Sequence, residues 1–263
     1  MEQPSAGPPR CDDLPGQIQP VPSLLVASPL GIMGVMARTD SMARTDSTFA
    51  LAALTAASGC LDVACFTRLG NTFASVMTSN MVFIAFAAVR ADAALAEHCV
   101  AALGGYITGV AAGSALARVG GKQDRFGELP VNLVLACEFA VLVAVAVWWI
   151  ALGAQPTGGQ QTALLAVAAL AMGMQGAAAR QIVGQRHTGT TYLTGTLTDL
   201  VAAVATRRRP DPVALLCLAG LLIGAAIAAV LLRSAADTTT LFPAAMLAIV
   251  SLLSWRRRRR HVT

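Results

Sequence analysis

Charged residues are scarce in this sequence. Of its 263 residues, 19 are Lys or Arg and 14 are Asp or Glu, together 13% of the chain, whereas a soluble domain has about 25%. Aromatic residues are also few, at 5%, while hydrophobic residues make up 56%. This composition argues against a water-soluble globular domain and against a disordered chain, and the mean hydropathy of +0.64 agrees. It predicts an integral membrane protein.

Residues that would hold a metal or a cofactor are equally sparse. Six cysteines in a chain of this length are too few for a disulfide scaffold. His98, His187 and His261 have no partners at ligand spacing, and we interpret them as residues of the membrane interface. The sequence contains no Gly-rich phosphate loop, no G-x-S-x-G turn and no H-E-x-x-H helix. We therefore expect no metal, no cofactor and no enzymatic activity.

Long apolar runs dominate the chain instead. A helix needs about 20 mostly apolar residues to cross a bilayer core of about 30 Å, and an isolated strand would leave its backbone groups unpaired in lipid. Six runs meet this requirement: residues 49–67, 99–117, 131–153, 162–179, 213–232 and 238–255. The predicted fold class is all-α, a polytopic bundle of transmembrane helices.

Two further segments, residues 72–89 and 188–206, begin polar and end apolar. Each could span the membrane, or could enter it and return as a broken helix. If both return, only Arg68, Arg90 and Arg233 among the counted basic residues lie outside the cytoplasm, which fits the positive-inside rule better than eight spans do. Either arrangement has an even number of crossings, so we expect a plasma-membrane protein with both termini cytoplasmic.

The two ends of the chain differ from the membrane domain, residues 48–255. Seven of the 12 prolines lie between Pro4 and Pro29, and this composition predicts a disordered tail over residues 1–47. The tail 256–263 begins with Arg256–Arg260, directly after an apolar helix. We interpret this run as a membrane anchor that contacts the bilayer and its anionic lipids, not as a nucleic-acid site.

Three features recur in the same order in two halves, at about 49–117 and 162–233: a polar residue after a glycine, a polar triplet, and a glycine-patterned helix. They are Gly59 with Asp62, Thr78-Ser79-Asn80 and Gly105 with Gly109 and Gly113, then Gly173 with Gln175, Thr194-Gly195-Thr196 and Gly220 with Gly224. The offsets are 113 residues for the polar residue, 116 for the triplet and 111 for the glycines. The order predicts an internal repeat, which would be inverted with six spans, as in many transporters, and parallel with eight.

Four of these stretches also carry a family resemblance. GCLDVACF, LGNTFASVMTSN, MGMQGAAARQ and TYLTGTLT occur in an order and spacing that resemble the YoaK family of bacterial membrane proteins, a domain-of-unknown-function family. The resemblance covers about residues 50–235, with Ser79 where the family more often has Gly and Gly176 where it often has Asn. It implies a multi-pass plasma-membrane protein and supplies no activity.

Asp62 is the most informative polar residue because it lies inside the first predicted span. An ionised Asp at a helix centre costs about 2.5 to 3.5 kcal/mol, so Asp62 should face the bundle interior or a wet cavity. Asp62 could handle an ion or a proton, could hold helices together by hydrogen bonds, or could pair with Arg180. Glu138 could be a second carboxylate in the bundle or a hydrated residue near its edge.

The remaining polar groups allow two interpretations each. Asp199 could coordinate a cation or cap the half-helix that begins at Leu200, and Gln175 could bond across the repeat. The triplets could break their helices to form a site or a tight turn. The leading prediction is a transporter or permease for a small solute or ion; the alternative is a non-transporting scaffold or partner-binding protein, and either could be a homo-oligomer. The candidate site residues are Asp62, Thr78, Ser79, Asn80, Gln175, Thr194, Gly195, Thr196 and Asp199, with Arg180 and Glu138 as candidate charge partners.

Overall fold

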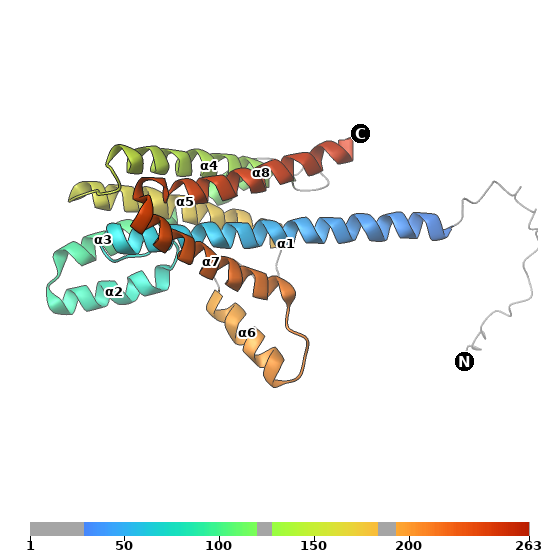
Figure 1. The fold of residues 1–263 in the computed structure, drawn as a ribbon, viewed down its shortest axis with the longest axis horizontal. Coiled ribbons are helices and arrows are strands. Elements are labelled where there is room, and N and C mark those ends of the chain that lie inside the picture. The colour runs from blue at the N-terminus through green and yellow to red at the C-terminus, as the bar shows by residue number, and fades with distance from the viewer. Residues whose placement is uncertain (1–28, 120–127, 184–192, 263) are drawn as a thin grey trace, which may run out of the picture. The chain divides into compact units, whose positions relative to one another are not determined.

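The structure is a computed structural model, and it describes residues 29–119, 128–183 and 193–262, with side chains over 48–118, 131–181 and 193–256. The chain divides into two units, residues 1–42 and 43–263, and the packing described below is that of the second. Figure 1 shows the helices, and no strand occurs in the described ranges. They are α1 Pro29–Arg68, α2 Met77–Arg90, α3 Ala93–Val119, α4 Glu128–Ala151, α5 Gly159–Val183, α6 Leu193–Ala205, α7 Pro212–Ser234, the 3₁₀ turn η1 Ala236–Thr238 and α8 Leu241–Val262.

Helix α1 begins before the first apolar run does. Pro29 is its first residue, a position where the missing N–H of proline removes no helical hydrogen bond. From residue 35 onward the segment holds neither Gly nor Pro before the membrane run, so nothing interrupts the helix. Residues 29–47 of the predicted tail thus belong to α1, and residues 1–28 lie outside the described part of the chain.

Six helical segments are long and apolar enough to cross a membrane, as the sequence predicts. They are Thr48–Arg68, Ala93–Arg118, Val131–Ala151, Gly159–Gln181, Pro212–Ser234 and Ala236–Arg256. Helices α2 and α6 have 14 and 13 residues. At 1.5 Å per residue each is about 20 Å long, too short to cross a core of about 30 Å.

Glycines allow α3 and α5 to pack backbone against backbone. A Cβ added to Gly105 would lie 2.1 Å from the carbonyl oxygen of Ala166, and one added to Gly109 would lie 2.0 Å from that of Leu170. From the other side, a Cβ on Gly173 would lie 2.2 Å from the carbonyl oxygen of Tyr106. The contact positions rise together along both helices, so α3 and α5 run in the same direction.

Helices α1 and α7 pack in the same way. A Cβ on Gly220 would lie 2.6 Å from the carbonyl oxygen of Ala52, and one on Gly224 would lie 1.9 Å from that of Ala56. Gly59 returns the contact, because its added Cβ would lie 2.3 Å from the carbonyl oxygen of Leu221. These two helices are therefore also parallel to each other, and no side chain larger than hydrogen fits at the glycines.

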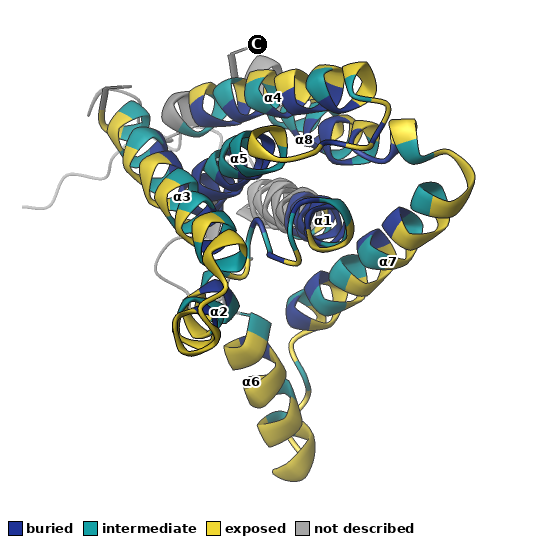
Figure 2. Ribbon diagram, turned by 90° about the vertical axis from the view of Figure 1, so that its left-hand side faces the viewer, coloured by how far each residue is buried: buried dark blue, intermediate teal, exposed yellow. Residues whose placement is uncertain are grey.

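Helices α1 and α5 run in opposite directions at the centre of the bundle. Gln161 Nε2, near the start of α5, donates to the carbonyl oxygen of Arg68 at the end of α1 (3.0 Å), whereas Gln175 lower on α5 donates to that of Leu54 (2.9 Å). Helix α4 packs against α5 and α8, and Trp149 Nε1 donates to the carbonyl oxygen of Ala236 at 2.9 Å. Figure 2 shows the buried faces of these helices turned inward and the exposed faces outward.

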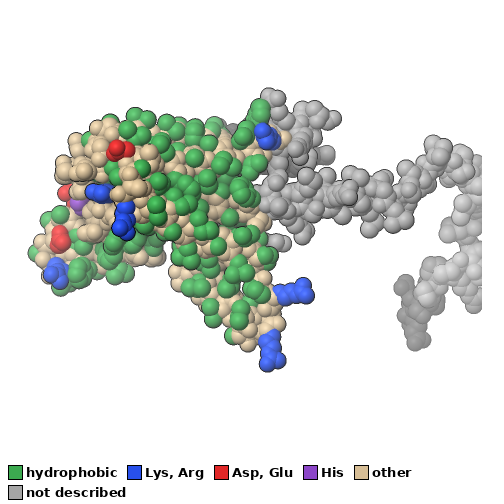
Figure 3. Space-filling view, in the orientation of Figure 1, with side chains coloured by type: hydrophobic (Ala, Val, Ile, Leu, Met, Phe, Trp, Pro, Cys, Tyr) green, Lys and Arg blue, Asp and Glu red, His purple; other side chains and the backbone are tan. Residues whose placement is uncertain are grey.

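The outer surface of the second unit is apolar, as a lipid-facing surface must be. Val82, Leu222 and Val230 are 67%, 69% and 64% exposed, although large aliphatic side chains in a soluble protein are mostly buried. In Figure 3 hydrophobic side chains cover the middle of the visible face, while the charged side chains in view lie near the ends. This distribution supports the membrane assignment.

Candidate functional site

Residues 69–76, between α1 and α2, turn back along α1 and are called the return segment below. The reversal occurs at Gly70 and Asn71, whose φ angles are +85° and +57°. Glycine and asparagine tolerate this left-handed region better than other residues do. Thr72 then closes the turn, because its Oγ1 donates to the carbonyl oxygen of Leu69 at 3.1 Å.

Asp62 holds the return segment against α1. Its Oδ1 accepts the backbone N–H of Ser75 at 2.8 Å and its Oδ2 accepts the Ser75 hydroxyl at 2.5 Å, while its side chain is 5% exposed. Asp62 stands six residues before the end of α1, which is about 9 Å along the helix axis. Ser75 thus lies well inside the span, where non-helical backbone is tolerated only if protein covers it or it lines a cavity.

Asn80 holds the same segment from α2. Its Oδ1 accepts the N–H of Phe73 at 3.1 Å, and its Nδ2 donates to the carbonyl oxygen of Phe73 at 2.7 Å. The side chain is fully buried, whereas Thr78 is exposed and Ser79 is half-buried. Thr78 and Ser79 line a cavity of about 260 Å³ together with Val82 and Phe83.

The second triplet, at the start of α6, shows the same order of burial. Thr196 is buried, while Thr194 and Gly195 are exposed. A Cβ added to Gly195 would meet nothing within 4 Å, so this glycine is not there to relieve a close contact. Asp199, one turn after Thr196, is also exposed. The residues that precede α6 lie outside the described ranges.

Gln175 connects α5 to α1 beside the Asp62 site. Its Nε2 donates to the carbonyl oxygen of Leu54 at 2.9 Å and to Ser58 Oγ at 2.8 Å. Its Oε1 is buried and has no hydrogen-bond partner in the described part of the chain. Ser58 lies one helical turn from Asp62, so the two polar residues that the repeat pairs in sequence bind adjacent turns of α1.

The two candidate charge partners lie elsewhere. Arg180 is exposed near the end of α5, and Ser75 occupies both carboxylate oxygens of Asp62. Glu138 is fully buried inside the bundle, and over the described residues neither of its carboxyl oxygens has a hydrogen-bond partner. Asp62, Asn80 and Gln175 thus converge on the α1 side of the return segment, while Arg180, Asp199 and Glu138 do not join them.

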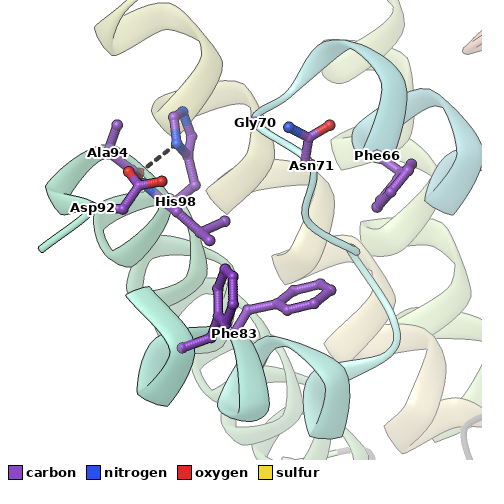
Figure 4. A pocket seen from close by; sticks show the side chains of 9 residues that line it. Phe66, Gly70, Asn71, Phe83, Asp92, Ala94 and His98 are labelled. Carbon is purple, nitrogen blue, oxygen red and sulfur yellow. Dashed lines mark hydrogen bonds between the residues drawn. The ribbon is translucent and has the colours of Figure 1, made fainter. Parts of the chain in front are cut away.

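Sequence reasoning missed a second cavity, of about 320 Å³, among the end of α1, the α2 helix and the start of α3. Figure 4 shows Asp92 and His98 on one side of it, Phe66 on the other and Phe83 below. His98 Nδ1 lies 2.7 Å from the carbonyl oxygen of Ala94, which places a proton on that nitrogen because a carbonyl only accepts. One signal could have revealed the cavity, since four of the eight phenylalanines fall between residues 66 and 86.

Comparison with known proteins gives a family and no activity. The family model described as "Protein of unknown function (DUF1275)" matches residues 50–253. No curated protein and no solved structure matches the chain. The matched range contains the return segment, both triplets, and Asp62 with Gln175, and it agrees with the resemblance noted from the four sequence stretches. The chain belongs to the DUF1275 family of proteins of unknown function.

Proposed function

We propose that this protein is a permease that passes a small polar solute or ion, with the half-helices α2 and α6 beside the path. The observation that carries the proposal is the return segment, a stretch of non-helical backbone bonded to Asp62 inside the span. Interrupted helices at mid-membrane depth are typical of transport proteins, where they form binding sites. A protein that only held helices together would gain nothing from such a break.

The orientation of the half-helices supports the same function. In Figures 1 and 2 the beginnings of α2 and α6 lie toward each other on one side of the bundle. The residues exposed there include Thr78, Thr194 and Gly195. Helix N-termini carry a positive partial charge and free N–H groups, so a polar solute between them would find hydrogen-bond donors and hydroxyl groups at a depth where lipid offers none.

The glycine contacts support an inverted internal repeat. Gly59 and Gly173 are 114 residues apart, and each lies against the carbonyl oxygen of one helix residue and the N–H of the residue four positions later: Leu221 and Ala225 for Gly59, Tyr106 and Val110 for Gly173, 115 residues apart in both cases. The contacts between α1 and α7 thus repeat those between α5 and α3. The sequence prediction aligned Gly109 with Gly220, and the contacts instead favour Gly105 with Gly220 and Gly109 with Gly224.

The positive-inside rule gives the orientation that we propose. With six spans, the Arg68 end of α1 faces outward and both termini face the cytoplasm, where Arg207–Arg209 and Arg256–Arg260 also lie. The second of these runs would contact anionic lipid of the inner leaflet. Cysteine substitutions at Arg90 and Arg125 in intact cells test this orientation, because six spans make position 90 reachable from outside by a charged thiol reagent and position 125 unreachable.

Flux through reconstituted full-length protein tests the function. Proteoliposomes are challenged with a panel of inorganic ions, amines, amino acids and sugars, and uptake is compared with that of empty liposomes. We expect uptake of at least one solute, and we expect Ser79→Leu to reduce it because the larger side chain enters the 260 Å³ cavity. The control is Thr108→Leu, since Thr108 is exposed on α3 and bonds only to its own helix.

The alternative, a non-transporting scaffold, has one observation in its favour. The carboxylate of Asp62 and the amide of Asn80 are fully used in holding the return segment, so neither needs a solute to explain it. This alternative predicts that wild type, Ser79→Leu and Thr108→Leu are all indistinguishable from empty liposomes. That result, with folded protein in every sample, would end the permease proposal.

A further inference from the structure

The 320 Å³ cavity among α1, α2 and α3 differs from the Thr78 site in its chemistry. Its described lining combines the aromatic rings of Phe66, Phe83 and Phe86 with a single carboxylate, Asp92, and no Lys or Arg. Its volume is at the lower end of the range of small-molecule pockets, about 300 to 1,000 Å³. Apolar walls with a few converging polar groups are the usual construction of a ligand site.

Asp92 is available to a ligand although it also caps α3. Its Oδ1 accepts the N–H of Leu95 at 3.0 Å, which leaves the second oxygen and the full negative charge at the cavity. Figure 4 shows this carboxylate across the cavity from the Phe66 ring. A carboxylate therefore favours a cation in this space, and the negative faces of phenyl rings favour one as well.

The chain itself already places a cation on one of these rings. The guanidinium carbon of Arg90 lies 5.2 Å from the centroid of the Phe86 ring, within the distance of a cation–π contact. Phe66 and Phe83 also line the cavity, and both are ordered by stacking on Phe73, with ring centroids 5.1 and 6.4 Å apart. These stacked rings form a wall for a ligand without further rearrangement.

We propose that this cavity binds an organic ammonium ion, a protonated amine or a quaternary ammonium group, between Asp92 and the rings of Phe66 and Phe83. An inorganic cation would prefer a cluster of oxygen ligands, and no group of three or more His, Cys, Asp or Glu residues that could hold a metal occurs in the described ranges. An alkylated ammonium ion instead gains from apolar walls and from the charge together. The inference names a solute class for the proposed permease and in that respect rests on it, but binding is measured without flux.

Titration of the purified full-length protein with tetramethylammonium and choline tests the site by ligand-observed NMR. Wild type is expected to bind both, and 3,3-dimethylbutan-1-ol, which has the shape of choline without its charge, is expected not to compete. Asp92→Asn should weaken binding at least tenfold, because asparagine keeps the cap on Leu95 and removes the charge. Phe83→Leu should weaken it several-fold, and Arg90→Gln should strengthen it by removing a nearby positive charge.

Asp211→Asn is the matched control, because Asp211 caps α7 through Val213 N–H at 3.0 Å in the way that Asp92 caps α3. It should bind like wild type. Binding that Asp92→Asn leaves unchanged, or equal competition by the neutral alcohol, would overturn the proposal, as would no binding to wild type. Repeating the titration in nanodiscs of phosphatidylcholine and of phosphatidylglycerol identifies the source of the group: a lipid ligand weakens choline binding only in the first. Absent binding with intact flux would reject this site alone.

Discussion

The two halves of the bundle have similar helix contacts and different polar contacts. In each half, a glycine of one helix meets a glycine-patterned helix of the other half with the same backbone partners. The polar residues that follow act differently: Asp62 binds the return segment of its own half, whereas Gln175 binds α1 of the opposite half. Backbone packing and site geometry are therefore separate properties of this fold.

The half-helices differ in the same sense. Asn80 and Ala87 are the buried residues of α2, and Thr196 is the only buried residue described in α6. Helix α2 also packs extensively against α3, and α6 has fewer contacts with α7. Since exposed surface and sparse contacts accompany low local stability, we expect α2 to be the fixed half-helix and α6 the half-helix that moves during transport.

Breaking the shared backbone contacts should have the largest effect. Gly109→Ala and Gly224→Ala each put a methyl group about 2 Å from a backbone carbonyl oxygen, so the helices must separate. We expect losses of at least about 1 to 3 kcal/mol in the free energy of unfolding, measured by chemical denaturation in detergent. Gly104→Ala and Gly195→Ala are the controls, because their added methyl groups meet nothing within 4 Å. Unequal losses at the first two positions would contradict the equivalence of the two contacts.

Removing the two polar anchors should sharpen the difference between the halves. Asp62→Leu leaves the N–H and hydroxyl of Ser75 without their acceptor, at a cost of about 1 to 3 kcal/mol for each group that stays buried. Gln175→Leu removes donors whose acceptors also bond elsewhere, since Leu54 accepts from Ser58, and should cost about 1 kcal/mol. Hydrogen exchange read by mass spectrometry should rise across residues 72–76 in the first variant only.

Equal exchange in the two variants would mean that Asp62 does not hold the return segment. A fully unfolded Asp62→Leu protein would be uninformative, so Asp62→Asn provides the milder variant. Asparagine still accepts the Ser75 N–H, and the Ser75 hydroxyl can turn to accept from its amide. We expect exchange intermediate between wild type and Asp62→Leu.

Glu138 allows a smaller test outside the repeat contacts. A buried carboxyl group without a hydrogen-bond partner destabilises a protein. Glu138→Leu is therefore expected to raise the free energy of unfolding by about 1 kcal/mol, and Glu138→Gln to leave it nearly unchanged. Ser251, which is 113 residues later in α8 and also has a buried hydroxyl without a partner in the described ranges, provides the comparison. A large loss in Glu138→Leu would show that Glu138 has a partner in the folded protein.

The sequence predicted the spans well because they depend on length and apolarity alone, and all six agree with the helices to within a few residues, except at the start of 99–117, where the helix begins at Ala93. It identified Asp62, Asn80 and Gln175 as polar residues inside the membrane. It did not predict that Asp62 and Asn80 bind a backbone segment, because that contact depends on the reversal at Gly70 and Asn71. Their φ angles are a property of the folded turn.

The Asp92 cavity could not be predicted for a related reason. Its lining residues come from three elements and from positions 66 to 98, and no spacing rule joins them. Gly70 packs directly on the imidazole of His98, since a Cβ there would lie 2.6 Å from the ring. Only this contact brings the return segment against α3, and a lone histidine in sequence gives no sign of it.

The exposed triplet hydroxyls should show the smallest change in stability and the clearest change in flux. Thr78→Val and Thr194→Val preserve shape and remove one hydroxyl each from exposed positions at the starts of α2 and α6. Stability should stay within about 0.5 kcal/mol of wild type, while uptake of the panel solute should fall in both variants because each half-helix loses a polar group facing the path. Thr108→Val, on the exposed face of α3, should change neither quantity. If Thr78→Val reduces uptake and Thr194→Val does not, the path follows α2 alone, and the similarity of the two halves concerns packing and not transport.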